Sequence, residues 1–106
     1  MNVGQLRRRL DIEQLNRVSD GAGGYATSWV NVDTVWAKVE PKIGRERLIA
    51  EQVSSRTNYD IVIRYRSDIT AEMRFRDGTQ VFHILSFFDE NDQKSYLKCI
   101  CEERKS

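Results

Sequence analysis

The sequence between residues 59 and 88 decides the fold. Residues 59–66 read YDIVIRYR and residues 72–76 read EMRFR, and both runs alternate apolar with polar or charged side chains. This period of two is typical of strands that bury one face. Asp77-Gly78 then gives a hairpin signal, and residues 79–88, TQVFHILSFF, are apolar on both phases, as in a strand covered on two sides. The stretch predicts an all-β, antiparallel structure.

We expect the first two of these runs to pair as antiparallel neighbours joined by residues 67–71. In the inferred register Arg64 faces Arg74 and Tyr65 faces Met73, which gives one apolar face and one basic face. The basic face consists of Arg64, Arg66, Arg74 and Arg76. Three interpretations of it stay open: a solvated face balanced by nearby carboxylates, contact with acidic residues of a neighbouring subunit, and contact with phosphate.

Further strands are predicted on either side of this stretch. Altogether the strands are expected over residues 8–15, 26–39, 59–66, 72–76, 79–88 and 95–101. Residues 19–25, SDGAGGY, contain three glycines and predict a chain reversal. A change of phase near Asp33 indicates a bulge, and Pro41 is expected to end the second strand. About six short strands at close spacing predict a small antiparallel β-barrel or sandwich.

The chain has 106 residues, of which 40% are hydrophobic and 31% charged, so we expect a single domain over residues 1–106. Residues 42–57 form a long polar insertion after the second strand. Loops longer than about 12–15 residues are usually functional or disordered, and we expect this one to be mobile. A short helix over residues 46–53 is the open alternative.

Composition and motifs argue against several classes of function. Lys and Arg number 17 against 16 Asp and Glu, and this net charge of +1 does not give the basic field of a duplex-binding module. No apolar run fits a signal peptide or a membrane span. Cys99, Cys101 and the single histidine, His83, do not supply a metal-binding set, and we expect them to pack as ordinary side chains. We therefore predict no enzyme activity, no metal and no cofactor.

The order of several short motifs is more informative than any one of them. Gly-x-Leu opens a basic run and a strand at Gly4, Val-Trp-Ala stands at residues 35–37, Gly-x-Glu begins the insertion at Gly44, and Ile-x-Ile-Arg-Tyr-Arg spans residues 61–66. In this order, from Gly4 to Cys101, the chain resembles the phage head-tail joining family. Members of that family act as adaptors or stoppers in the head completion complex.

The resemblance implies a structural protein of the virion that is made and assembled in the bacterial cytoplasm. It implies a ring of identical subunits, six- or twelve-fold, between a portal-side adaptor and tail-side completion proteins, with no membrane partner. Genomic DNA would pass through the ring's channel without sequence-specific binding. The residues implied to line or gate that channel are Gly44, Arg45, Glu46, Leu48, Ile49, Glu51 and Val53. The residues expected at subunit or partner interfaces are Trp29, Trp36, Arg64, Arg66, Arg74 and Arg76.

The alternative function is a small β-barrel that binds single-stranded nucleic acid. Tyr59, Tyr65 and Phe75 would then stack on bases beside the arginines. These rings alternate away from the arginines, toward the face that we expect to be core. A salt-sensitive affinity for single-stranded oligonucleotides would favour this alternative over a connector subunit.

Overall fold

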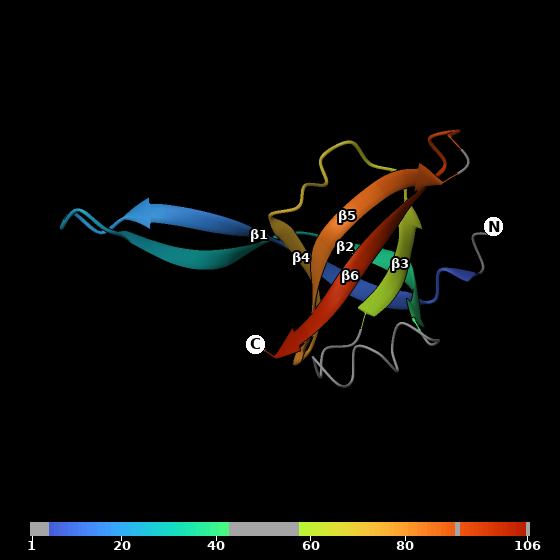
Figure 1. Ribbon diagram of the computed structural model, residues 1–106, viewed down its shortest axis with the longest axis horizontal. Helices are drawn as coiled ribbons and strands as arrows, with labels where there is room; N and C mark the ends of the chain where they lie inside the picture. The colour runs from blue at the N-terminus through green and yellow to red at the C-terminus, as the bar shows by residue number, and fades with distance from the viewer. Residues whose placement is uncertain (1–4, 43–57, 91, 106) are drawn as a thin grey trace.

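The computed structural model describes residues 5–42, 58–90 and 92–105, which form a closed antiparallel barrel (Figure 1). Its six strands are β1 (Arg8–Ser19), β2 (Tyr25–Pro41), β3 (Asn58–Arg64), β4 (Met73–Asp77), β5 (Gln80–Glu90) and β6 (Tyr96–Lys105). They follow the order β1-β2-β3-β6-β5-β4 around the barrel. The described ranges contain no α-helix, and hence no helix long and apolar enough to cross a membrane. The prediction of a small all-β fold is confirmed.

The core consists of the inward-facing side chains of the alternating strands. Leu10, Ile12, Ile61, Ile63, Phe75, Phe82, Cys99 and Cys101 each expose less than 2% of their surface. Burying one large apolar side chain stabilises a fold by roughly 1.5–3 kcal/mol, so this set is the main source of stability. Both thiols are free and lie within the core, as predicted.

The predicted pairing of residues 59–66 with residues 72–76 is wrong. β3 pairs with β2 and β6, whereas β4 pairs with β1 and β5. The connection between β3 and β4 crosses one end of the barrel instead of turning tightly, and Ile69 on it is buried in the core (Figure 1). Because both edges of β3 are occupied, Arg64 does not face Arg74. The four arginines do not form one basic face.

β1 and β2 continue beyond the barrel as a projecting hairpin (Figure 1). β1 pairs with β4 only over residues 11–14, and β2 pairs with β3 only over residues 37–41. The two strands pair with each other much further, from Arg8–Ala37 to Ser19–Tyr25. Their register shifts between Ile12 and Glu13, which confirms the bulge predicted near Asp33. The outer part of the hairpin, beyond residue 14 of β1, therefore has no strand on either outer edge.

The remaining turn predictions are confirmed with small shifts. Asp77 pairs with Gln80, so the two residues of the β4–β5 turn are Gly78 and Thr79. Gly78 adopts a φ of +62°, a conformation that glycine reaches without strain. Pro41 is the last residue of β2, as expected. β6 runs on to Lys105, beyond residue 101, where the last predicted strand ends.

The predicted insertion follows directly after β2. Its residues 43–57 lie outside the described residues, and so do the short helix predicted there and the predicted channel residues Gly44, Arg45, Glu46, Leu48, Ile49, Glu51 and Val53.

Candidate functional site: an arginine-lined apolar groove

The six side chains predicted at interfaces lie in two separate places. Trp29, Arg74 and Arg76 gather where the projecting hairpin leaves the barrel. Trp36, Arg64 and Arg66 gather at a groove beside the start of β1. We call the first group, together with Glu13, the root cluster, and we call the second place the arginine groove.

The root cluster satisfies its own charges. Glu13 Oε1 accepts hydrogen bonds from Arg74 Nε at 2.7 Å and from Arg76 Nε at 3.2 Å. The guanidinium of Arg74 also covers the indole of Trp29, with 4.0 Å between its carbon and the ring centroid. His83 completes the stack, because its ring meets Trp29 edge-on at 5.5 Å. These groups are used within the subunit, which argues against Arg74 and Arg76 as anchors for a partner.

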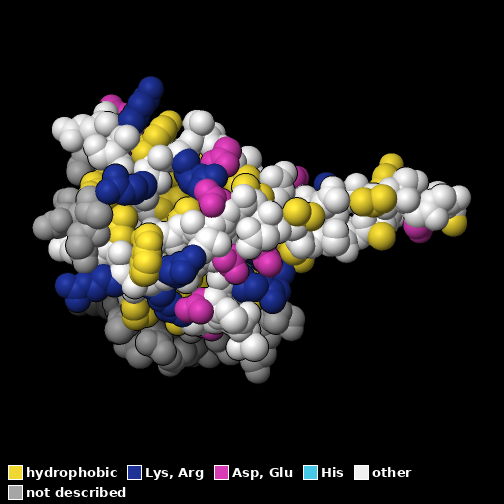
Figure 2. Space-filling model, turned by 180° about the vertical axis from the view of Figure 1, so that it is seen from behind, with side chains coloured by type: hydrophobic (Ala, Val, Ile, Leu, Met, Phe, Trp, Pro, Cys, Tyr) yellow, Lys and Arg dark blue, Asp and Glu magenta, His cyan; other side chains and the backbone are white. Residues whose placement is uncertain are grey.

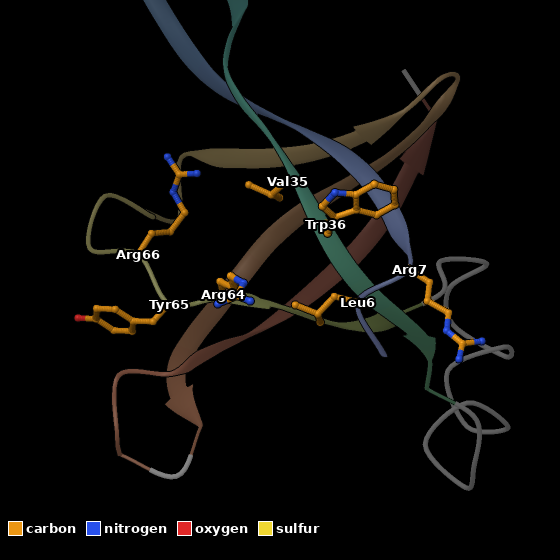
Figure 3. Close-up of a pocket in the computed structure, with 7 residues that line it drawn as sticks. All are labelled: Leu6, Arg7, Val35, Trp36, Arg64, Tyr65 and Arg66. Atoms are coloured by element: carbon orange, nitrogen blue, oxygen red, sulfur yellow. The ribbon is translucent and has the colours of Figure 1, made fainter. Parts of the chain in front are cut away.

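Three segments form the arginine groove, an open hollow of about 770 Å³. Its lining residues are Leu6, Arg7, Val35, Trp36, Arg64, Tyr65 and Arg66. Leu6 and Arg7 precede β1, Val35 and Trp36 belong to β2, and Arg64 to Arg66 end β3 and begin the connection that follows (Figure 3). The tryptophan exposes 54% of its surface. The groove thus combines an accessible apolar ring with several guanidinium groups.

The arginines of the groove differ in how their charges are compensated. Arg66 donates to both carboxylate oxygens of Asp68, at 2.7 and 2.8 Å, and to Asp33 at 2.8 Å. These hydrogen bonds from the Arg66 guanidinium lower the pKa of Asp33 and of Asp68 below the ordinary value. Arg64 is exposed, and its side chain makes no hydrogen bond or ion pair within the described part of the chain. Arg64 is therefore the charge that an incoming anion would meet.

A further arginine borders the groove along the β1–β2 ladder. Arg9 lies opposite Trp36 in register, and its guanidinium carbon is 5.7 Å from the centroid of that ring. This contact holds one face of the indole in place and adds positive charge beside it. A ligand with a negative group and an apolar or aromatic side chain matches this combination.

Sequence reasoning found Trp36, Arg64 and Arg66 but missed Leu6, Arg7, Val35 and Tyr65 as their neighbours. The basic run before β1 was recognised in the sequence. Its proximity to Arg64 was not predicted, because the two segments are far apart in the sequence. The pairing of β2 with both β1 and β3 brings these segments together. Only the strand order of the barrel reveals that.

The other chemical candidates lie apart from each other or within the core. Cys99 and Cys101 belong to the barrel core, where burial raises the pKa of Cys99 to about 12 and also raises that of Cys101. His83 lies on the outside of the wall against Trp29, so it does not reach a thiol as a base. No group of acidic, histidine or cysteine side chains with a metal-binding arrangement occurs among the described residues.

The structure also weakens the nucleic-acid alternative. Phe75 is fully buried, and Tyr59 packs edge-on against Phe82 with ring centroids 5.0 Å apart. Tyr65 is partly buried against the core. Phe75 and Tyr59 therefore lack the open faces on which bases stack.

Exposed apolar side chains occur in two further regions. Val18, Tyr25, Val30 and Val32 are exposed on the projecting hairpin, and Figure 2 shows apolar side chains along its length. Leu85, Phe87 and Phe88 are exposed on the second half of β5.

Comparisons with known proteins give one family and similar solved structures. The profile of a family described as phage head completion protein matches residues 1–104. A chain in the virion of a native gene transfer agent particle is 28% identical, with a TM-score of 0.68, covering 95% of this chain and 97% of that one. Protein SF1141 from Shigella flexneri 2a is also 28% identical, with a TM-score of 0.72 and coverage of 97% and 96%. No curated protein matches the sequence.

Proposed function

This chain belongs to the phage head completion protein family, and from that premise we propose that it forms a ring of identical subunits that joins the phage head to the tail. The family assignment makes it a structural protein of the virion that contacts other head or tail proteins. The match over residues 1–104 is the observation that carries this function. We propose that residues 1–106 act as one connector domain.

Ring assembly is supported by the distribution of surfaces on the subunit. A closed ring needs head-to-tail contacts, in which two different surfaces of each copy meet. The arginine groove and the projecting hairpin are two such surfaces, and they differ in shape and charge. We propose that Trp36, Arg64 and Arg66 take part in these contacts. We also propose, from the family, that the ring is six- or twelve-fold and stacks between a portal-side adaptor and tail-side completion proteins.

We propose from the family alone that residues 42–57 border the channel through which the genomic DNA passes. Nearly all of this segment lies outside the described residues. Deleting residues 46–54 tests the proposal: the variant should fold with the barrel's thermal stability while particles lose retained DNA or joined tails. Insoluble expression of the variant would show instead that the segment belongs to the fold.

Removing the gene from a strain that produces the particles tests the function itself. We expect DNA-filled heads to lose their contents or to remain without tails, and the full-length gene to restore infectious or transducing particles. Normal tailed particles from the deletion strain would contradict the proposal. A salt-sensitive affinity of the purified protein for single-stranded oligonucleotides would favour the nucleic-acid alternative.

A further inference from the structure

The projecting hairpin needs a cover that its own barrel does not provide. Its outer part is a two-stranded ribbon, and such a ribbon alone in water is marginally stable. Tyr25, at its far end, exposes 72% of its surface. Unpaired edges and exposed apolar groups are features that soluble proteins normally protect. Another molecule is the natural source of that protection.

The tip of the hairpin is ordered by its own hydrogen bonds. Asp20 Oδ1 accepts the backbone N–H groups of Ala22 at 2.8 Å and Gly24 at 3.1 Å, and the Asp20 N–H donates to the Gly24 carbonyl at 3.1 Å. Gly21 and Gly23 take φ values of +79° and +85°, which this tight path requires. The tip is therefore a preformed knob, which lowers the entropy lost when it docks.

The knob carries one negative charge and one exposed aromatic ring. Asp20 is the only charged residue between positions 18 and 32. Hydrogen bonds from the Ala22 and Gly24 N–H groups lower the pKa of its carboxyl, so it stays ionised. Tyr25 follows directly at the start of β2.

The arginine groove offers the complementary groups. Arg64 has no anionic partner within the described residues, and Trp36 presents an exposed ring in the same groove. The carboxylate of the tip is complementary in charge to the guanidinium of Arg64. The tyrosine of the tip can pack against the ring of Trp36, because aromatic rings pack favourably against one another.

A subunit's own tip does not reach its own groove. Tyr25 and Trp36 belong to the same strand, eleven residues apart. At ~3.3 Å per residue this separates them by roughly 36 Å of extended strand. The contact can therefore form only between molecules.

We propose that the hairpin tip of one copy of this chain docks in the arginine groove of the next copy, with Asp20 facing Arg64 and Tyr25 packing on Trp36. The proposal rests on the proposed function and specifies how the ring closes. One such contact, repeated around an axis, is the head-to-tail interface that a ring requires. An acidic segment of another virion protein in the groove is the competing occupant.

A charge exchange tests the contact. D20K and R64D each place like charges together, so each variant alone should lose oligomers by at least tenfold in sedimentation velocity. Mixed in equal amounts they should assemble again, because the lysine-bearing tip of D20K matches the aspartate-bearing groove of R64D, and the two unaltered surfaces match each other. The double variant D20K/R64D should assemble alone. Asp92→Lys, at another exposed turn, is the matched control and should assemble as the native protein does.

The remaining outcomes are equally decisive. Asp20→Asn keeps the acceptor oxygen of the turn but removes the negative charge. A partial loss of oligomers in this variant measures the contribution of the charge apart from that of the shape of the knob. Native-like assembly of both single variants, or no recovery in the mixture, would overturn the tip-in-groove contact while leaving a ring intact. If the native protein forms no oligomer, either alone or with its portal-side partner, the ring fails too. If the variants still form homo-oligomers but no longer bind the portal-side partner, the groove binds that other virion protein instead.

Discussion

The guanidinium carbon of Arg74 lies 4.0 Å from the centroid of the Trp29 ring, and this contact joins the barrel to its projecting hairpin. Trp29 belongs to the part of β2 beyond the bulge, whereas Arg74 belongs to β4 in the barrel wall. Glu13 on β1 adds the hydrogen bond that holds the guanidinium in this position. The root cluster therefore sets the direction in which the hairpin leaves the barrel.

Replacing Arg74 with methionine should destabilise the protein and loosen the hairpin. The Arg74 and Glu13 side chains expose 8% and 13% of their surface, so the change leaves a mostly buried carboxylate with one partner fewer. We expect the free energy of unfolding to fall by about 3 kcal/mol in urea denaturation. Arg17→Met, which removes an exposed ion pair 3.9 Å long, should change it by less than about 0.5 kcal/mol. Equal losses of stability in the two variants would show that the root cluster stabilises the fold no more than an exposed ion pair does.

Replacing Arg64 with alanine should leave stability almost unchanged but weaken assembly. The side chain is exposed and has no ion pair within the described residues, and surface changes of this kind usually stay within about 0.5 kcal/mol. Thermal unfolding measures the first effect, and sedimentation of the oligomer measures the second. A variant that is unstable, or that assembles as the native protein does, contradicts the role given to Arg64.

The thiols of Cys99 and Cys101 should resist modification in the folded protein. Burial raises the pKa of Cys99 to about 12, so the reactive thiolate is scarce at pH 8. A thiol reagent at pH 8 should label neither cysteine until denaturant is added, when both react. Since the folded pKa values lie above the ordinary value of 9.0, stability should also decline as the pH rises above 9.0. Rapid labelling of the native protein would place the thiols outside the core.

His83 should make the fold less stable in mild acid. Burial lowers its pKa below 6.5, and the charges of Arg104 and Arg74 lower it further, while Glu102 opposes them. The unfolded chain then binds the proton more readily, so stability contributed by neutral His83 is present above pH 6.5 and is lost as the pH falls. Urea denaturation between about pH 7 and pH 5 measures this loss, and His83→Gln should reduce it. Identical pH dependence in both proteins would show that His83 does not contribute.

The strands were largely predictable from the sequence because each of them buries one face of the barrel. Leu10, Ile12, Ile61 and Ile63 show the alternation, and all of them lie in the core. The extent of the hairpin was not predictable, since beyond residue 15 neither face of β1 is buried and the apolar pattern disappears. The bulge and the glycine turn were visible because they depend on local chemistry.

Strand order was the part that local patterns did not reveal. Residues 67–71 look like a short turn, but β3 and β4 are not neighbours in the barrel, and the connection between them crosses the barrel end with Ile69 buried. That error placed Arg64 and Arg74 on one face. Because of the same error, the predicted arrangement did not place Arg64 beside Leu6 and Val35, which line the same groove. Arg64 and Arg66 were predicted from the sequence, but their neighbours in the groove, Arg7 among them, are known only from the fold.

Electron cryomicroscopy of intact particles tests the central claim most directly. We expect a ring of copies of this chain at the junction of head and tail, coaxial with the DNA channel, with the projecting hairpin of each copy reaching its neighbour. Particles whose junction lacks this protein, or that hold it as isolated copies elsewhere on the capsid, would contradict the claim.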